Sequence, residues 1–191
     1  MNLLISKKLF RKTVLEYRRM LHHHEYVMRN KRLMELLLNF LLEEKKKYIH
    51  VFLPIRRNKE PNIFLILPEL WKAGIDTVTS IVDFELKSMS HIFLSADTDI
   101  KKNELDIPEP QNGKTADVDL INIFLIPLLV ADKQGNRIGY GGGYYDKLLK
   151  ETKAIKVGLS LSNPVDKIIQ NENWDVSLDF LITPFRIYKN G

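Results

Sequence analysis

The chain has no cysteine among its 191 residues. Disulfide bonds, cysteine-ligated zinc and thiol nucleophiles are therefore excluded. No stretch approaches the ~20 consecutive apolar residues of a membrane-spanning helix, so we expect no membrane association. A short apolar run precedes the first lysines, the reverse of the order in a secretory signal, and the cytoplasm is the expected location.

Two common nucleotide-binding motifs are also absent. The P-loop pattern G-x-x-x-x-G-K-[ST] has no match, because no lysine followed by serine or threonine ends a glycine-rich loop. The dinucleotide pattern G-x-G-x-x-G fails as well, since a frame that begins at Gly139 places Tyr144 at its third glycine. These absences disfavour P-loop enzymes and Rossmann dehydrogenases.

The charge is moderately positive, with 29 Lys and Arg against 24 Asp and Glu, a net charge of +5. This excess suits an anionic ligand such as a nucleoside triphosphate, a polyglutamate tail or a nucleic acid. Nucleic-acid-binding proteins cluster basic residues around aromatic platforms, whereas here the basic residues are dispersed among acidic ones. We therefore expect no nucleic-acid partner, although charge alone leaves that class open.

The hydrophobic pattern predicts one domain of the α/β class over residues 1–191. Hydrophobic residues make up 45% of the chain, enough for a core, and predicted strands alternate with helices, which favours a mostly parallel sheet covered by helices. The predicted helices are two within 7–46, one over 61–73 that Pro68 kinks or shortens, and one over 144–150. The predicted strands cover 48–53, 77–82, 86–94, 118–127, 154–160 and 180–183, with a long loop at 95–117.

The most informative segment runs from Arg137 to Asp146, R-I-G-Y-G-G-G-Y-Y-D, directly after the most apolar predicted strand. Four glycines in five positions let backbone amides approach a ligand, and the start of a helix favours an anion. Arg137 adds a cation suited to phosphate, and Asp146 is placed to hold a magnesium ion. Glycine density alone would equally fit a flexible turn. The flanking charges favour a phosphate site.

This segment resembles the R-[LI]-G-x-G-x-G-Y-Y-D motif of the 5-formyltetrahydrofolate cyclo-ligase family. The resemblance extends over nearly the whole chain. Three weaker matches follow in the expected order, namely Lys7 to Arg11 with K-x-x-x-R, Ile107 to Pro110 with I-P-x-P, and Asp175 to Asp179 with D-x-x-L-D followed by Thr183.

The resemblance implies a three-layer α/β/α single domain of the ribose-phosphate-isomerase and CoA-transferase-like type. It implies ATP-dependent conversion of 5-formyltetrahydrofolate to 5,10-methenyltetrahydrofolate, with release of ADP and phosphate. The implied cofactors are ATP and Mg²⁺. The implied substrate is 5-formyltetrahydrofolate, with or without a polyglutamate tail, and we expect a monomer.

Site residues carried over from the family fall into four overlapping groups. The implied catalytic residues are Arg137, Glu60 and Tyr144, and the implied magnesium ligands are Asp146 and Asp175. The implied ATP-binding residues are Lys7, Lys8, Leu9, Phe10, Arg11, Arg137, Ile138, Gly139, Tyr140, Gly141, Gly142, Gly143, Tyr144 and Tyr145. The implied substrate-binding residues are Leu53, Glu60, Tyr140, Gly141, Gly142, Gly143 and Tyr144.

Two departures from the family pattern concern the folate. Glu60 is followed by Pro61-Asn62-Ile63, where the family usually has E-x-[DE]-T. Leu105-Asp106 stands where an aromatic ring often precedes the I-P-x-P loop, so a ring that stacks on the pterin has to come from elsewhere. An accessory protein that binds folate or nucleotide without cyclo-ligase activity is the alternative that these departures leave open.

Overall fold

The computed structural model describes residues 7–168 and 175–190, with the backbone alone described at Lys7. The helices are α1 (Lys7–Met20), α2 (His23–Glu44), α3 (Leu67–Lys72) and α4 (Tyr144–Lys150), with 3-10 turns η1 (Arg56–Asn58), η2 (Ile63–Leu65) and η3 (Val118–Leu120). The strands are β1 (Tyr48–His50), β2 (Asp76–Asp83), β3 (Ser88–Leu94), β4 (Ile100–Lys102), β5 (Pro108–Pro110), β6 (Ile123–Pro127), β7 (Val130–Ala131), β8 (Arg137–Ile138), β9 (Ile155–Leu159), β10 (Phe180–Ile182) and β11 (Ile187–Lys189).

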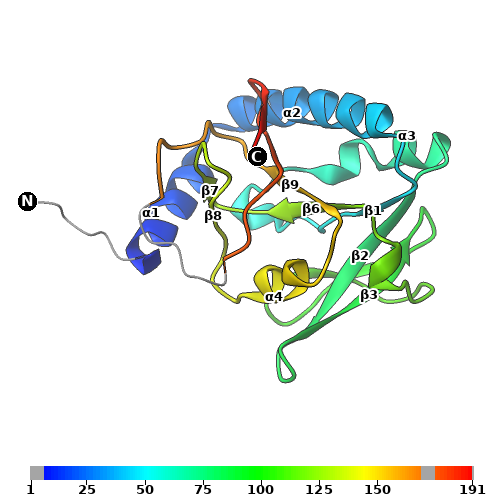
Figure 1. Cartoon of the computed structure of the whole chain (residues 1–191). Coiled ribbons are helices and arrows are strands. Elements are labelled where there is room, and N and C mark those ends of the chain that lie inside the picture. The colour runs from blue at the N-terminus through cyan, green and yellow to red at the C-terminus, as the bar shows by residue number, and fades with distance from the viewer. Residues whose placement is uncertain (1–6, 169–174, 191) are drawn as a thin grey trace, which may run out of the picture.

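A seven-stranded sheet organises the fold, in the order β11-β10-β9-β6-β1-β2-β3. The five strands from β10 to β2 pair in parallel, and β11 and β3 pair antiparallel at the two edges. In Figure 1, α2 and α3 lie on one side of this sheet and α4 lies on the other. The prediction of an α/β fold with a mostly parallel sheet between helical layers is confirmed.

Strand β6 shows why the sheet needs covering on both faces. Successive side chains of a strand point to opposite faces. Ile123 and Leu125 join the core cluster under α2, whereas Phe124 and Ile126 join the cluster that includes Leu149 of α4. These four side chains are fully buried, which explains the apolar run of β6.

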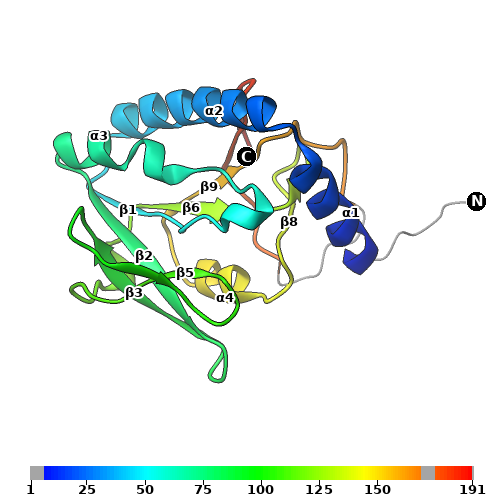
Figure 2. The same cartoon turned by 180° about the vertical axis from the view of Figure 1, so that it is seen from behind.

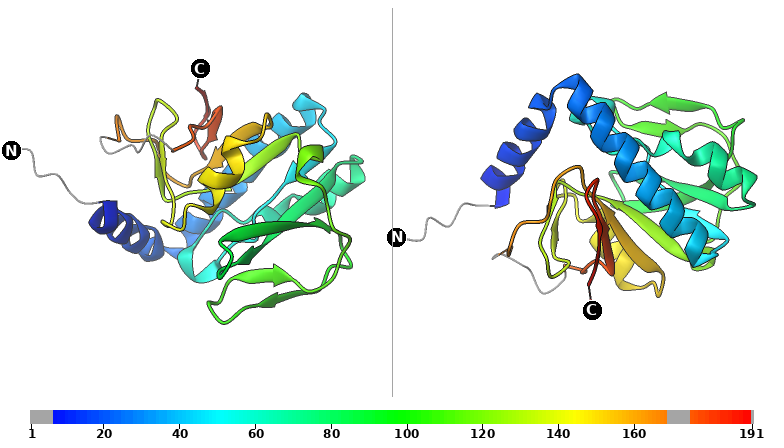
Figure 3. Two further views of the ribbon diagram at one scale, coloured as in Figure 1. Left: turned by 60° about the horizontal axis from the view of Figure 1, so that its bottom comes forward. Right: turned by 90° about the horizontal axis from the view of Figure 1, so that it is seen from above.

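Helix α2 buries one stripe against the sheet. Leu33, Leu37 and Leu41 recur every fourth residue and are fully buried. Helix α1 lies apart from this layer, at the end of the sheet near the β7–β8 hairpin (Figures 2 and 3). Its Phe10 and Val14 pack against a small cluster that includes Ile138 of β8. The predicted pair of helices within 7–46 is thus confirmed, but only the second one covers the sheet.

Several predicted boundaries are wrong for local reasons. The strand predicted from residue 118 begins at Ile123, because the Asp117 carboxylate accepts a hydrogen bond from the Asp119 amide (3.0 Å) and starts the turn η3. The strand predicted at 48–53 ends at His50, although the Val51 amide still donates to the Val78 carbonyl (2.7 Å). Leu120, near the start of the first run, is 43% exposed, whereas Val51, Phe52 and Leu53 stay buried beyond the end of β1.

Other errors involve proline. The helix predicted over 61–73 is the turn η2 followed by α3, and Pro68 lies in the first turn of α3, where the missing amide hydrogen breaks no helical bond. The predicted loop 95–117 contains the antiparallel hairpin β4–β5, whose second strand begins and ends with proline. Pro68 therefore shortens the predicted helix and does not kink it, and the predicted loop contains a short hairpin. Strand β11 was not predicted at all.

Among the described residues, no helix is both long and apolar enough to cross a lipid bilayer.

Candidate active site

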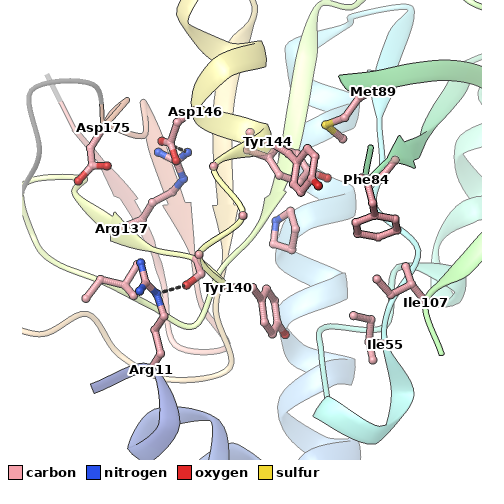
Figure 4. A pocket seen from close by; sticks show the side chains of 18 residues that line it. Arg11, Ile55, Phe84, Met89, Ile107, Arg137, Tyr140, Tyr144, Asp146 and Asp175 are labelled. Atoms are coloured by element: carbon pink, nitrogen blue, oxygen red, sulfur yellow. Dashed lines mark hydrogen bonds and ion pairs between the residues drawn. The ribbon is translucent and has the colours of Figure 1, made fainter. Parts of the chain in front are cut away.

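A cavity of about 600 Å³ lies where β1, β2 and β6 end at their carboxyl edge (Figure 4). Ligands of open α/β sheets bind at this edge. One end of the cavity is polar and is formed by the glycine-rich loop with Arg11, Arg137, Asp146 and Asp175. The other end is apolar and is formed by Ile55, Val82, Phe84, Met89 and Ile107. A molecule with an anionic part and a flat apolar part fits this division.

The glycine-rich loop, Gly139–Gly143, connects β8 to α4 and lines the polar end. Gly141 has a φ of +104° and Gly143 a φ of +73°, conformations that other residues rarely adopt. A Cβ atom on Gly142 would lie 2.7 Å from the Tyr144 ring. The loop path therefore requires glycine at these positions, as a loop that presents its backbone to a ligand does.

Among its described side chains, helix α1 contributes Arg11 to this end. The Arg11 Nε donates to the Gly139 carbonyl (3.1 Å), and the guanidinium lies against Gly141. Lys8 is exposed, Leu9 is 54% exposed and Phe10 packs against the β7–β8 hairpin, and none of these three lines the cavity. The side chain of Lys7 lies outside the described part of the chain. Of the residues predicted in α1, Arg11 is the one that the structure brings to the cavity.

Arg137 and Asp146 form an ion pair at the polar end. The Arg137 Nη2 lies 2.6 Å from the Asp146 Oδ1, and the Arg137 side chain is only 5% exposed. The Arg137 Nη1 donates to the Val176 carbonyl, and the Val176 amide donates to the same Asp146 oxygen (3.3 Å). Arg137 is therefore a fixed positive charge in the cavity wall, and its position depends on Asp146.

The carboxylates of Asp146 and Asp175 both line the polar end, on either side of Arg137 (Figure 4). No group of three or more histidine, cysteine, aspartate or glutamate residues that could hold a metal occurs within residues 7–168 and 175–190. Mg²⁺ is commonly held by one or two carboxylates together with the phosphates of a nucleotide. The two aspartates fit that kind of site, with the remaining ligands supplied by phosphate and water.

Glu60 is placed behind the cavity wall and does not line it. It is 2% exposed, its Oε2 accepts from the Ile55 amide (2.6 Å), and its Oε1 accepts from the Tyr140 hydroxyl. Burial raises the pKa of Glu60, whereas the hydrogen bonds from Tyr140 and Ile55 and the charge of Arg18 act in the opposite direction. Tyr140 thus stands between Glu60 and the cavity.

Leu53 is likewise away from the cavity lining. It is 7% exposed and belongs to the core cluster under α2. Leu53 therefore packs in the core. It does not line the cavity, although Ile55, two residues later in the chain, does.

The tyrosines of the motif have three different surroundings. Tyr140 lines the cavity, and burial together with the neighbouring Glu60 charge raises the pKa of its hydroxyl. Tyr144 meets Phe84 edge to face, with ring centroids 6.0 Å apart at 87°. The Tyr145 ring meets His50 edge to face (5.9 Å, 77°), and burial raises the pKa of the Tyr145 hydroxyl. All three rings line the cavity at the junction of its polar and apolar ends.

Phe84 and Arg18 are among the residues of the site that were not predicted. Phe84, in the turn between β2 and β3, provides an aromatic ring at the apolar end, whereas Leu105 is 52% exposed. Arg18 is a buried cation behind the glycine-rich loop. The sequence signal for Arg18 is weak, because a single arginine in a basic amphipathic helix is usually solvated.

Comparison with known proteins gives a consistent picture. Residues 5–184 match the model of the 5-formyltetrahydrofolate cyclo-ligase family. The 5-formyltetrahydrofolate cyclo-ligase of Escherichia coli K12 is 25% identical over 130 residues, which cover 65% of this chain and 71% of that protein. The enzyme of the same name from Haemophilus influenzae is 37% identical over 92 residues, 45% of this chain and 49% of that protein.

Solved structures agree with these sequence matches. The 5,10-methenyltetrahydrofolate synthetase of Aquifex aeolicus has a TM-score of 0.83 at 25% identity, covering 97% of this chain and 93% of that one. The 5,10-methenyltetrahydrofolate synthetase of Mycoplasma pneumoniae has a TM-score of 0.76 at 26% identity, covering 94% of this chain and 99% of that one.

Proposed function

The chain belongs to the 5-formyltetrahydrofolate cyclo-ligase family, and from this premise we propose that the cavity beside Gly139–Gly143 carries out the family's reaction. The protein is a ligase that converts 5-formyltetrahydrofolate to 5,10-methenyltetrahydrofolate with cleavage of ATP to ADP and phosphate. The observation that carries the site assignment is the division of one cavity of about 600 Å³ into a polar end and an apolar end. ATP phosphates occupy the polar end, and the pterin occupies the apolar end.

The reaction needs both ligands in one cavity for a chemical reason. An N-formyl oxygen is a poor leaving group, so the formyl oxygen attacks the γ-phosphorus of ATP and ADP departs. The N10 amine of the folate then attacks the formyl carbon, the C–O bond breaks, phosphate leaves, and N10 loses its proton. The formyl oxygen is therefore required within attacking distance of the γ-phosphate, about 3–3.5 Å.

The polar end supplies charge at fixed positions. Arg11 and Arg137 face the phosphates, and the backbone of Gly139–Gly143 approaches them closely. Lys7 and Lys8 stay in the proposed ATP-binding set on the family pattern alone, one turn before Arg11 in α1. Asp146 and Asp175 are the residues that would hold Mg²⁺ together with phosphate oxygens, where the ion neutralises negative charge on the transferring phosphoryl group.

The apolar end positions the pterin. Phe84 and Tyr144 present rings, and Ile55, Met89 and Ile107 complete the wall. Glu60 acts through Tyr140, since its two carboxylate oxygens already accept hydrogen bonds from the protein. Catalysis then rests on positioning and on fixed charge, without a covalent intermediate on the protein.

The finer properties of the enzyme follow from the same assignment. The net charge of +5 supports folates that carry a polyglutamate tail as substrates. The continuous sheet, together with a family match over residues 5–184, supports one domain for the whole chain. We propose a monomeric cytoplasmic enzyme, and size-exclusion chromatography with light scattering tests the monomer directly.

The test mixes the protein with ATP, Mg²⁺ and 5-formyltetrahydrofolate, and records the near-ultraviolet absorbance of the methenyl product together with ADP. We expect the two products to appear in a 1:1 ratio, and neither to appear without ATP. Binding of both ligands without formation of either product would instead assign the chain as an accessory protein of this family.

A further inference from the structure

Arg18 is a buried cation that joins α1 to three other segments. Its side chain is 7% exposed. The Nε donates to the Asn58 carbonyl in η1 (2.7 Å), the Nη1 donates to the Leu128 carbonyl just after β6 (3.0 Å), and the Nη2 donates to the Tyr140 hydroxyl in the glycine-rich loop. Arg18 does not line the cavity, so any effect on substrate passes through another residue.

The direction of the hydrogen bonds at Tyr140 is fixed by chemistry. A guanidinium donates and cannot accept, so the Tyr140 oxygen is the acceptor from Arg18. The Tyr140 hydroxyl donates its hydrogen to Glu60, whose Oε1 accepts it. The Tyr140 hydroxyl thus lies between a buried positive charge and a buried carboxyl group, and it carries the contact between them.

This arrangement fixes an otherwise loosely held ring. Tyr140 is flanked by Gly139 and Gly141, which restrict the backbone little, and the Tyr140 side chain is 39% exposed at the cavity. Two hydrogen bonds at the far end of the ring hold its orientation. Arg11 holds the Gly139 carbonyl separately, from two turns earlier in α1.

We infer that Arg18 is a positioning residue for the folate, because it holds the Tyr140 hydroxyl on Glu60 and thereby sets the ring face that Tyr140 presents to the cavity. The inference rests on the proposed function and adds to it a residue that does not touch either ligand. Arg11 lines the polar end of the cavity and Arg18 does not, so we expect loss of Arg18 to act first on the folate.

Arg19 offers a matched control. It is the next residue of α1, and it also binds η1, through the Asn58 Oδ1 (Nε at 3.1 Å), but it makes no contact with the glycine-rich loop. Replacing Arg19 weakens the same α1–η1 junction without touching Tyr140. A difference between Arg18 and Arg19 variants therefore reports on the Tyr140 contact and not on the junction.

The experiment is a double-mutant cycle of Arg18→Met and Tyr140→Phe, read first as the Kd of 5-formyltetrahydrofolate without ATP. We expect each single variant to raise this Kd about tenfold, because each one breaks the same hydrogen-bonded chain. The Kd of the double variant for 5-formyltetrahydrofolate is then no higher than the larger of the two single-variant values. Arg19→Met, the matched control, leaves this Kd unchanged.

Tyr140→Phe keeps the ring and fills the same space, so it remains informative if Arg18→Met does not fold. An unchanged folate Kd in Tyr140→Phe overturns the inference, and so do additive effects in the cycle. A wild-type chain that fails to bind 5-formyltetrahydrofolate overturns the proposed function and the inference together. Additivity in a wild-type background that binds and turns over the folate overturns the inference alone.

Discussion

The two ends of the cavity are built in different ways. The polar end comes mainly from one stretch of sequence, Arg137–Asp146, completed by Arg11 and Asp175. The apolar end is assembled from separate segments, with Ile55 from the segment before η1 and Phe84 from the turn of the β2–β3 hairpin. Met89 of β3 and Ile107 ahead of β5 complete it.

The difference reflects what each ligand part requires. Phosphate recognition needs backbone amides and charges at short, fixed spacing, which a continuous loop and the following helix provide. An apolar wall needs shape and area, which many combinations of side chains provide equally well. The polar end is therefore recognisable as a motif, and the apolar end only as a surface in three dimensions.

The largest expected effect comes from Arg137, in the polar end of the cavity. Arg137→Ala removes the buried cation, and we expect kcat/KM to fall about 10²–10³-fold. It also leaves Asp146 without its partner, so a lower melting temperature accompanies the loss. Arg32→Ala, at an exposed ion pair on α2, is the control and keeps full activity. An unchanged rate in Arg137→Ala would remove this residue from the phosphate site.

Asp146 tests whether the polar end holds magnesium. Asp146→Asn keeps the size of the side chain and removes the charge, and we expect the Mg²⁺ concentration for half-maximal activity to rise about 10–100-fold. Asp166→Asn, at a side chain that is 93% exposed, is the matched control. Identical magnesium titrations of Asp146→Asn and wild type count against a ligand role.

Phe84 tests the apolar end in isolation. Phe84→Ala removes a ring that faces Tyr144, and we expect KM for 5-formyltetrahydrofolate to rise about tenfold while KM for ATP stays constant. Phe185→Ala removes a 56% exposed ring that does not line the cavity, and changes neither constant. An equal rise of both constants in Phe84→Ala contradicts the separation of the two ends.

His50 lies beside Tyr145, a residue of the cavity lining, and it gives the smallest effect. Its Nε2 lies 2.8 Å from the Ser80 Oγ of β2, its ring meets Tyr145, and it is fully buried. Burial, followed by the nearby His91, lowers the pKa of His50 to about 3, below its unfolded value of 6.5. Between these values the unfolded chain binds the extra proton, so His50 contributes stability above pH 6.5 that is lost as the pH falls toward 3.

His50→Gln therefore makes stability less sensitive to acid. We expect the free energy of unfolding of wild type to fall by about 1 kcal/mol more than that of the variant between pH 6.5 and 5.5. Urea unfolding at both pH values measures this difference. His24→Gln, at an exposed histidine, retains the wild-type pH dependence. Equal pH dependence in His50→Gln and wild type contradicts the burial argument.

Features with a local cause were predictable from the sequence. Helix α4 has the predicted bounds, because the glycines of 139–143 end one element and the apolar spacing of 144–150 begins the next. The position of Arg11 beside the loop followed from the family pattern and is seen as a contact with Gly139. These features depend on neighbours in sequence or on a motif whose residues meet in space.

Features that depend on tertiary packing were not predictable. Phe84 looked like any residue of a hairpin turn, and the β4–β5 hairpin was hidden by prolines at both ends of its second strand. Glu60 was expected to touch the folate directly. The structure instead places Tyr140 in front of it, a relation that depends on a loop 80 residues further along the chain.

The contact between Arg11 and Gly139 joins residues separated by 128 positions. Closing so long a segment is entropically unfavourable until β1, β2, β3 and β6, which lie between these two residues in the chain, have paired. During synthesis, α1 leaves the ribosome long before the glycine-rich loop exists to receive it. We therefore expect the polar end of the cavity to be among the last parts of the molecule to assemble.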